Sequence, residues 1–146
     1  MMSLTTVQLA RSAPLTSLSR GHFGFVHHVK KMKMSKKTIC VDFDGVIHAY
    51  SKGFHDGTIY DPPTPGTSLA LQKLHDEYKV VVLSARARDE RLVKQIWDWL
   101  ATYQLDGYVS SVTNVKPPAV AYIDDRAITF IDWADVPEGI RRLGEF

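Results

Sequence analysis

Short apolar runs alternate along the chain with longer segments in which apolar residues recur at helical spacing. Residues 38–43 and 79–84 are apolar and β-branched, which is typical of buried strands. Apolar side chains at helical spacing predict helices over residues 66–78 and 89–103. Because strands and helices alternate, we expect crossover connections and a parallel sheet covered by helices on both faces.

The remaining elements are shorter. The pattern predicts strands over residues 107–112, 119–123 and 127–131, and a closing helix over residues 137–143. Residues 46–61, in which glycines and aromatics alternate with polar residues, predict an irregular hairpin that we call the flap. The predicted fold class is α/β: a single three-layer, Rossmann-like domain with a central, mainly parallel sheet.

Charge divides the chain in two. No Asp or Glu precedes Asp42, although residues 1–37 contain several Lys and Arg. The formal net charge of +2 therefore combines a basic arm, residues 1–37, with an acidic domain, residues 38–146. The arm is rich in Ser and Thr and has no sustained helical or strand period, so we expect it to be poorly ordered.

Three interpretations of the arm remain open. It is acid-free and contains Arg and Ser, as organelle transit peptides do. The basic run of residues 30–37 also fits a nucleic-acid-binding tail. The third interpretation is non-native sequence upstream of a true start at Met34, and we favour it because Met34 leads directly into the first strand.

Composition narrows the class of protein. A chain of 146 residues is long enough to bury a core without disulfides. The single cysteine, Cys40, excludes an intramolecular disulfide and a four-cysteine zinc site. No apolar run approaches the ~20 residues that span a bilayer, so we expect no membrane partner. These features favour the cytoplasm, or an organelle if the arm is a transit peptide.

Reactive side chains follow the predicted strands. Asp42 and Asp44 end the first strand, Ser84 ends the second, Lys116 precedes the fourth, and the adjacent acids Asp124 and Asp125 end it. Ligand sites in open α/β sheets lie beyond the carboxyl ends of the strands, so these groups should meet at one edge. Clustered carboxylates need a compensating cation, and Mg²⁺ prefers carboxylate oxygens. The set therefore favours Mg²⁺-dependent phosphoryl transfer.

The same residues resemble the four motifs of the haloacid dehalogenase (HAD) superfamily. The segment Asp42–Val46 is similar to its first motif, Ser84 to its second, Lys116 to its third, and the Asp124–Asp125 pair to its fourth. The resemblance extends over residues 38–133. It implies a phosphatase and not a dehalogenase, because dehalogenases lack an acid at the position of Asp44.

The resemblance also implies a role for each residue. Asp42 would be the nucleophile that forms an aspartyl-phosphate, and Asp44 the general acid and base. Both would also be metal ligands, Asp44 through its backbone carbonyl, and Asp124 and Asp125 would complete the Mg²⁺ site. Ser84 and Lys116 would hold the phosphoryl group.

The intervals between the motif residues indicate how open the site is, and so which substrates it could admit. The predicted elements fill the intervals from Gly45 to Ser84 and from Ser84 to Lys116, so no large cap domain is expected. An open site suits a macromolecular substrate, or a homo-oligomer in which a neighbour covers it. We expect hydrolysis of a small phosphorylated metabolite, such as a nucleotide or sugar phosphate. The alternatives are a phosphatase for nucleic-acid ends or phosphoproteins, which the acidic domain disfavours, and a non-catalytic phospho-ligand-binding protein.

Two further residues are candidates for substrate contact. His48 lies in the flap and Arg86 follows Ser84. The plainer alternative for His48 is a packed flap residue. The plainer alternative for Arg86 is an ion pair with a nearby acid, such as Asp89 or Glu90.

Overall fold

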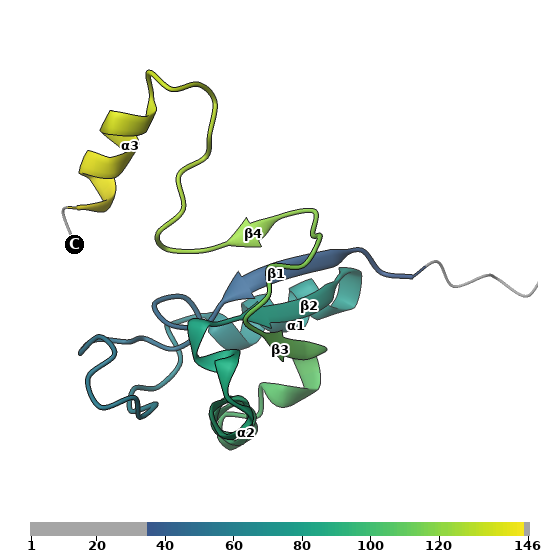
Figure 1. The fold of residues 1–146 in the computed structure, drawn as a ribbon. Coiled ribbons are helices and arrows are strands. Elements are labelled where there is room, and N and C mark those ends of the chain that lie inside the picture. The colour runs from purple at the N-terminus through teal and green to yellow at the C-terminus, as the bar shows by residue number, and fades with distance from the viewer. Residues whose placement is uncertain (1–34, 145–146) are drawn as a thin grey trace, which may run out of the picture. The chain divides into compact units, whose positions relative to one another are not determined.

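Four short parallel strands form the sheet in the computed structural model, which describes residues 35–144 (Figure 1). Their order across the sheet is β3-β2-β1-β4. The strands are β1 (Thr38–Asp42), β2 (Lys79–Leu83), β3 (Ser111–Thr113) and β4 (Tyr122–Ile123). The helices are α1 (Thr67–Glu77), α2 (Glu90–Thr102) and α3 (Val136–Leu143), with tight 3₁₀ turns η1 (Ala85–Arg88) and η2 (Asp106–Tyr108). An α/β fold with a parallel sheet is thus confirmed; residues 1–34 of the predicted arm lie outside the described residues.

The central strands form where the two apolar runs predicted them. β1 pairs with β2 in parallel over its whole length, from Thr38 opposite Lys79 to Asp42 opposite Leu83. Val80 and Val82 are fully buried, as expected of β-branched residues in a central parallel strand. This register brings the carboxyl ends of β1 and β2 to the same edge of the sheet.

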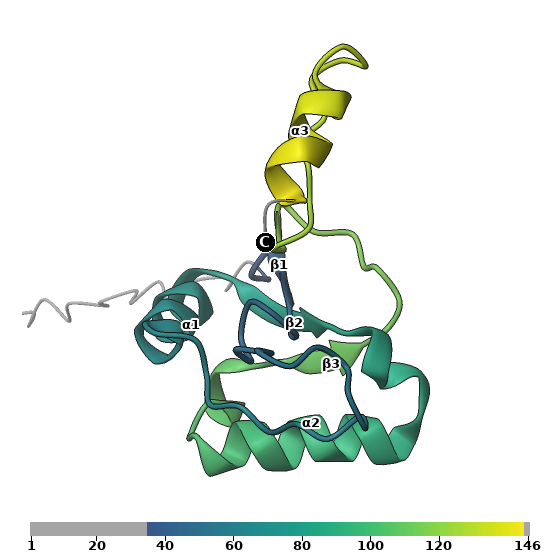
Figure 2. The ribbon, with the colours of Figure 1, turned by 90° about the vertical axis from the view of Figure 1, so that its left-hand side faces the viewer.

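Both crossover helices pack on one face of the sheet. Ile39 and Val41 of β1 alternate with Cys40 and join the same buried cluster as Val80 and Val82. From the helices, that cluster takes Leu71 of α1 and Ile96, Trp99 and Leu100 of α2. Figure 2 shows α1 and α2 beside the strands that they connect. Successive right-handed crossovers that step in one direction place their helices on one face.

Within residues 35–144, no helix contributes buried residues to a second layer on the sheet's other face. Cys40 and Val81 are buried but lie outside the cluster on the helical face. α3 forms where the closing helix was expected, yet it contains no buried residue. The predicted three-layer arrangement, with helices on both faces, therefore stays a prediction.

Two predicted strands are wrong in position or kind. Residues 107–112 begin with η2, which backbone hydrogen bonds from Tyr108 and Val109 close, and pairing with β2 starts only at Ser111. Residues 127–131 form no strand, and the Phe130 and Ile131 side chains are exposed. A β-branched run forms a strand only where it can pair with the edge of a sheet. Residues 127–131 do not pair with β4, which is the edge strand beside β1.

The flap is irregular, as expected. It contains no regular helix or strand, and isolated bridges join His48 to Asp44 and to Pro63. Its two ends are drawn together because the Asp61 backbone N–H donates to His48 Nε2 at 3.1 Å. Trp99 of α2 donates its indole N–H to the Asp61 carbonyl at 3.0 Å, which fixes the flap to the helical layer.

None of the helices in the described ranges has both the length and the apolar character that a membrane crossing needs.

The buried cluster predicts how two leucines differ in their contribution to stability. Leu100 of α2 is 0 % exposed and Leu69 of α1 is 58 % exposed. We expect Leu100→Ala to lower the free energy of unfolding by about 2–5 kcal/mol, because it leaves a cavity in the cluster. Leu69→Ala should change it by less than about 0.5 kcal/mol. Urea denaturation of both variants measures this, and equal losses would contradict the assignment of the core.

Candidate functional site

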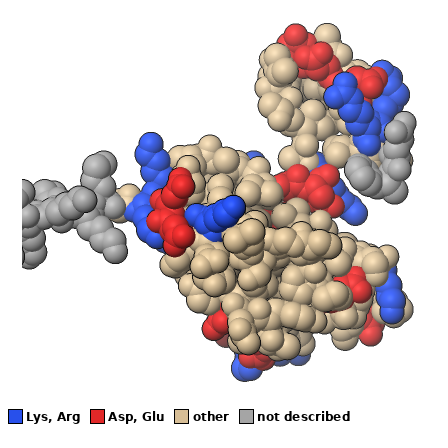
Figure 3. Space-filling model, turned by 180° about the vertical axis from the view of Figure 1, so that it is seen from behind, with Lys and Arg blue, Asp and Glu red and all other residues tan. Residues whose placement is uncertain are grey.

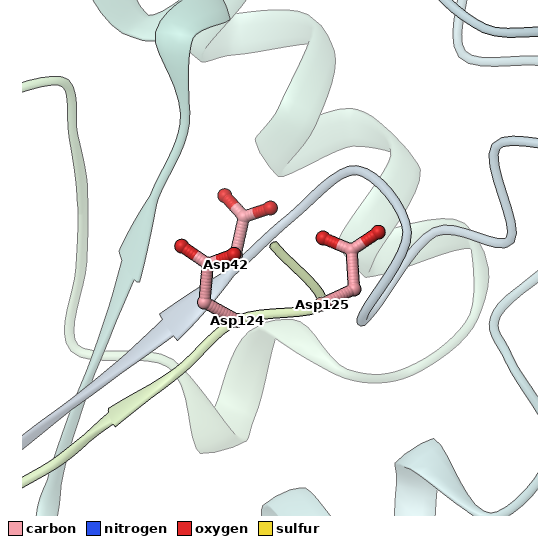
Figure 4. A group of neighbouring side chains, drawn as sticks. All are labelled: Asp42, Asp124 and Asp125. Atoms are coloured by element: carbon pink, nitrogen blue, oxygen red, sulfur yellow. The ribbon is translucent and has the colours of Figure 1, made fainter. Parts of the chain in front are cut away.

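Three carboxylates meet at the carboxyl ends of β1 and β4. Val41 lies opposite Ile123 in the parallel ladder, so Asp42 and Asp124 follow side by side. One oxygen each of Asp42, Asp124 and Asp125 lies within 4.8 Å of the others, and Figure 4 shows the three side chains together. Asp42 is partly buried, whereas Asp124 and Asp125 are exposed.

The pKa of Asp42 shows the electrostatic cost of this arrangement. Its pKa is raised from 3.8 to about 6, chiefly by burial and in addition by the negative charges of Asp124, Asp125 and Asp44, against a lowering by a backbone hydrogen bond from Phe43. Both effects disfavour the charged form of a carboxyl group. A cation between the three carboxylates would remove the repulsion and favour ionised Asp42.

Gly45 permits the close approach of Asp125. Its φ is +90°, a left-handed conformation that glycine adopts without steric cost. A Cβ atom at this position would lie 2.4 Å from Asp125 Oδ2. The glycine after Asp44 thus makes the turn possible and also leaves space for the carboxylate.

Asp44 lies in a different environment from Asp42, two residues away. Its Oδ1 is 2.8 Å from His48 Nδ1, and its Oδ2 accepts a hydrogen bond from Arg86 Nε at 2.7 Å. His48 is 0 % exposed and Arg86 is 3 % exposed. The structure therefore brings both predicted substrate-contact residues to Asp44, and Arg86 pairs with this acid instead of with Asp89 or Glu90.

Arg86 also binds the flap. Its Nη1 donates to the Gly57 carbonyl at 2.5 Å, and its guanidinium lies over the rings of Tyr50 and Phe54. The third nitrogen, Nη2, is buried and has no hydrogen-bond partner in the described part of the chain. A buried donor without a partner costs about 1–3 kcal/mol.

Ser84 and Lys116 are placed differently. Ser84 is buried directly after β2, where its Oγ accepts a hydrogen bond from the Arg86 backbone N–H at 3.2 Å. Lys116 is exposed, and its ammonium lies 4.2 Å from the centre of the Tyr122 ring. Within the described residues, Lys116 has no ion pair or hydrogen bond with the three clustered carboxylates.

The donor set fits a hard divalent cation. Mg²⁺ binds through one or two carboxylates and completes its octahedron with water or phosphate oxygens. Asp42, Asp124 and Asp125 supply oxygen donors from one side, and the exposure of the last two leaves room for other ligands. The side chains of these three residues would hold the metal, and a contribution from the Asp44 backbone carbonyl stays a prediction.

The bonds from Arg86 to Asp44 and to the flap at Gly57 were not predicted from the sequence. Arg86 and Asp44 are 42 positions apart, and the Gly57 contact uses a backbone carbonyl, which any residue type supplies. A buried arginine after a strand hints at an ion pair, but nothing local identifies the partner.

Comparison of the chain with protein-family models, with curated proteins and with solved structures finds no match. The site's interpretation therefore depends on its own geometry.

The raised pKa of Asp42 predicts a pH-dependent loss of stability in the metal-free protein. The folded state holds the Asp42 proton up to about pH 6, whereas the ordinary pKa of an aspartic acid is 3.8. Its contribution to stability is full below the lower value and is lost as the pH rises through the higher one. We expect Asp42→Asn to gain stability relative to the parent protein between about pH 4 and 6. Thermal melts in chelator at several pH values measure this difference, and a constant difference would contradict the shift.

Gly45 predicts a metal-binding defect without loss of a carboxylate. In Gly45→Ala the new Cβ displaces Asp125, so the Kd for Mg²⁺ should rise about tenfold or more. Gly66→Ala is the matched control, because Gly66 has φ +87° and open space around the new atom. Titration of Mg²⁺ followed by thermal shift compares the two. Equal effects would show that backbone strain, and not displacement of Asp125, is responsible.

Proposed function

We propose that the protein is a Mg²⁺-dependent phosphomonoester hydrolase of the HAD type, without a large cap, that acts through an aspartyl-phosphate. The observation that carries the proposal is the meeting of Asp42 with Asp124 and Asp125 at one sheet edge, while Asp44 is held separately by two donors. Ionisable groups with distinct environments suit distinct catalytic roles. The resemblance of the four motifs supports the same assignment.

Asp42 is the nucleophile in this proposal. A carboxylate oxygen attacks phosphorus, the P–O bond to the leaving group breaks, and Asp44 gives its proton to the departing oxygen. Water then attacks the phosphorus of the aspartyl-phosphate, Asp44 takes a proton from it, and free phosphate leaves as Asp42 is restored. Bound Mg²⁺ would supply charge neutralisation for the phosphoryl oxygens.

The remaining residues would bind and orient the substrate. Ser84, which is buried directly after β2, would donate a hydrogen bond from its hydroxyl to a phosphoryl oxygen. Lys116 would reach the same group by leaving the face of Tyr122. Tyr50 and Phe54, which stack on Arg86, offer aromatic surface to the rest of the substrate.

The distribution of charge favours a small substrate over a nucleic acid. Binding to a nucleic-acid backbone uses a basic surface that neutralises several phosphates. On the face drawn in Figure 3, the basic side chains of the described residues form small separate groups among uncharged and acidic ones. We therefore propose a small phosphorylated metabolite, such as a nucleotide or sugar phosphate, as the substrate.

Removal of the nucleophile tests the proposal. We expect Asp42→Asn to abolish phosphate release from an aryl phosphate, and excess chelator to stop the parent protein until Mg²⁺ is restored. Asp98→Asn is the matched control, since Asp98 is exposed and pairs with Lys94 on α2. The measurement is the rate of phosphate release from the aryl phosphate by the parent protein, Asp42→Asn and Asp98→Asn. Substantial activity of Asp42→Asn, or full activity in chelator, would overturn the nucleophile or the metal, respectively.

A further inference from the structure

Arg86 connects the flap to Asp44. The buried guanidinium uses Nε for the Asp44 carboxylate and Nη1 for the Gly57 carbonyl, at 2.7 and 2.5 Å. Gly57 lies in the flap and Asp44 at the start of the turn that precedes it, so the flap cannot move away at Gly57 without losing a bond to the group that holds Asp44. Tyr50 and Phe54 cover the same guanidinium with their rings.

His48 makes a second connection. A backbone N–H can only donate, so the Asp61 N–H requires an unprotonated Nε2 on the His48 ring. A neutral ring with a lone pair on Nε2 carries its proton on Nδ1, and that proton points to Asp44 Oδ1. The hydrogen bond that closes the ends of the flap therefore sets the tautomer that donates to Asp44.

We propose that Arg86 is a positioning residue that couples closure of the flap to the orientation of Asp44. Each carboxylate oxygen of Asp44 accepts from a donor that is itself bound to the flap backbone, at Gly57 or Asp61. The closed flap and the oriented carboxylate thus require each other. The catalytic consequence rests on the proposed function, whereas the coupling itself does not.

The coupling needs an arginine. Its planar fork presents several donors at fixed angles, so that two can hold different acceptors at once, whereas the lysine ammonium acts as a compact point charge. Arg86→Lys keeps the charge beside Asp44, but it cannot reproduce the two directed bonds together with the planar surface under Tyr50 and Phe54. The flap should then open more often.

Asp44→Asn breaks the same coupling from the other side with little change in shape. The amide group must face either Arg86 Nε–H or His48 Nδ1–H, and both are donors. In either orientation an N–H of the new side chain opposes an N–H of its neighbour. If Arg86→Lys lowers the stability of the whole domain, Asp44→Asn still tests the coupling.

Hydrogen exchange measures the coupling without any assay of activity. We expect amides of residues 50–61 to exchange about tenfold faster in Arg86→Lys and in Asp44→Asn, while α2 stays protected. Arg91→Lys is the matched control, because Arg91 pairs with Asp89 through Nε and Nη2 at an exposed site. Unchanged flap exchange in both variants would overturn the proposal. Faster exchange in Arg86→Lys alone would also overturn it, because the flap would then depend on Gly57 and not on Asp44.

Kinetics separate positioning from substrate contact. Arg86→Lys should lower kcat about tenfold or more at nearly constant KM, because a misplaced Asp44 transfers protons poorly once substrate is bound. A raised KM with unchanged kcat would overturn the positioning role and assign Arg86 Nη2 to substrate binding. If the parent protein releases no phosphate from any ester, the proposed function fails, and the exchange experiment still decides the coupling.

Discussion

The parallel pairing of β1 with β4 is the constraint on which the site depends. It places Val41 opposite Ile123, so the acids that follow these residues come together at one edge of the sheet. Burial and like charge raise the pKa of Asp42 to about 6 in consequence. A strand pairing of few residues thus creates a concentration of negative charge that a divalent cation would neutralise.

The turn after β1 separates two acids that the sequence places almost together. Asp42 meets other carboxylates, whereas Asp44 meets hydrogen-bond donors from His48 and Arg86. Gly45 makes this separation possible, since its left-handed backbone turns the chain and leaves space for Asp125. In the proposed function, the first of these carboxyl groups binds the cation and attacks phosphorus, and the second transfers protons.

Sequence reasoning was reliable where local pattern and tertiary environment agree. The apolar runs became β1 and β2, and helical periodicity gave α1 and α2 with small shifts at their ends. The strand predictions failed at residues 127–131, which pair with no sheet edge, and at residues 107–112, where η2 delays pairing until Ser111. Pairing is a non-local event, so composition alone cannot place a short edge strand.

The sequence by itself determined β1, β2, α1 and α2 and the acids at the strand ends, because periodicity and strand-end position are local properties of the chain. Only the tertiary structure decided which acids share a site and which are held apart, since that depends on strand order and on donors far along the chain. The link from Asp44 through Arg86 to Gly57 is of this second kind. It joins a side chain to a backbone carbonyl across a turn and a flap, and no residue pattern encodes such a contact.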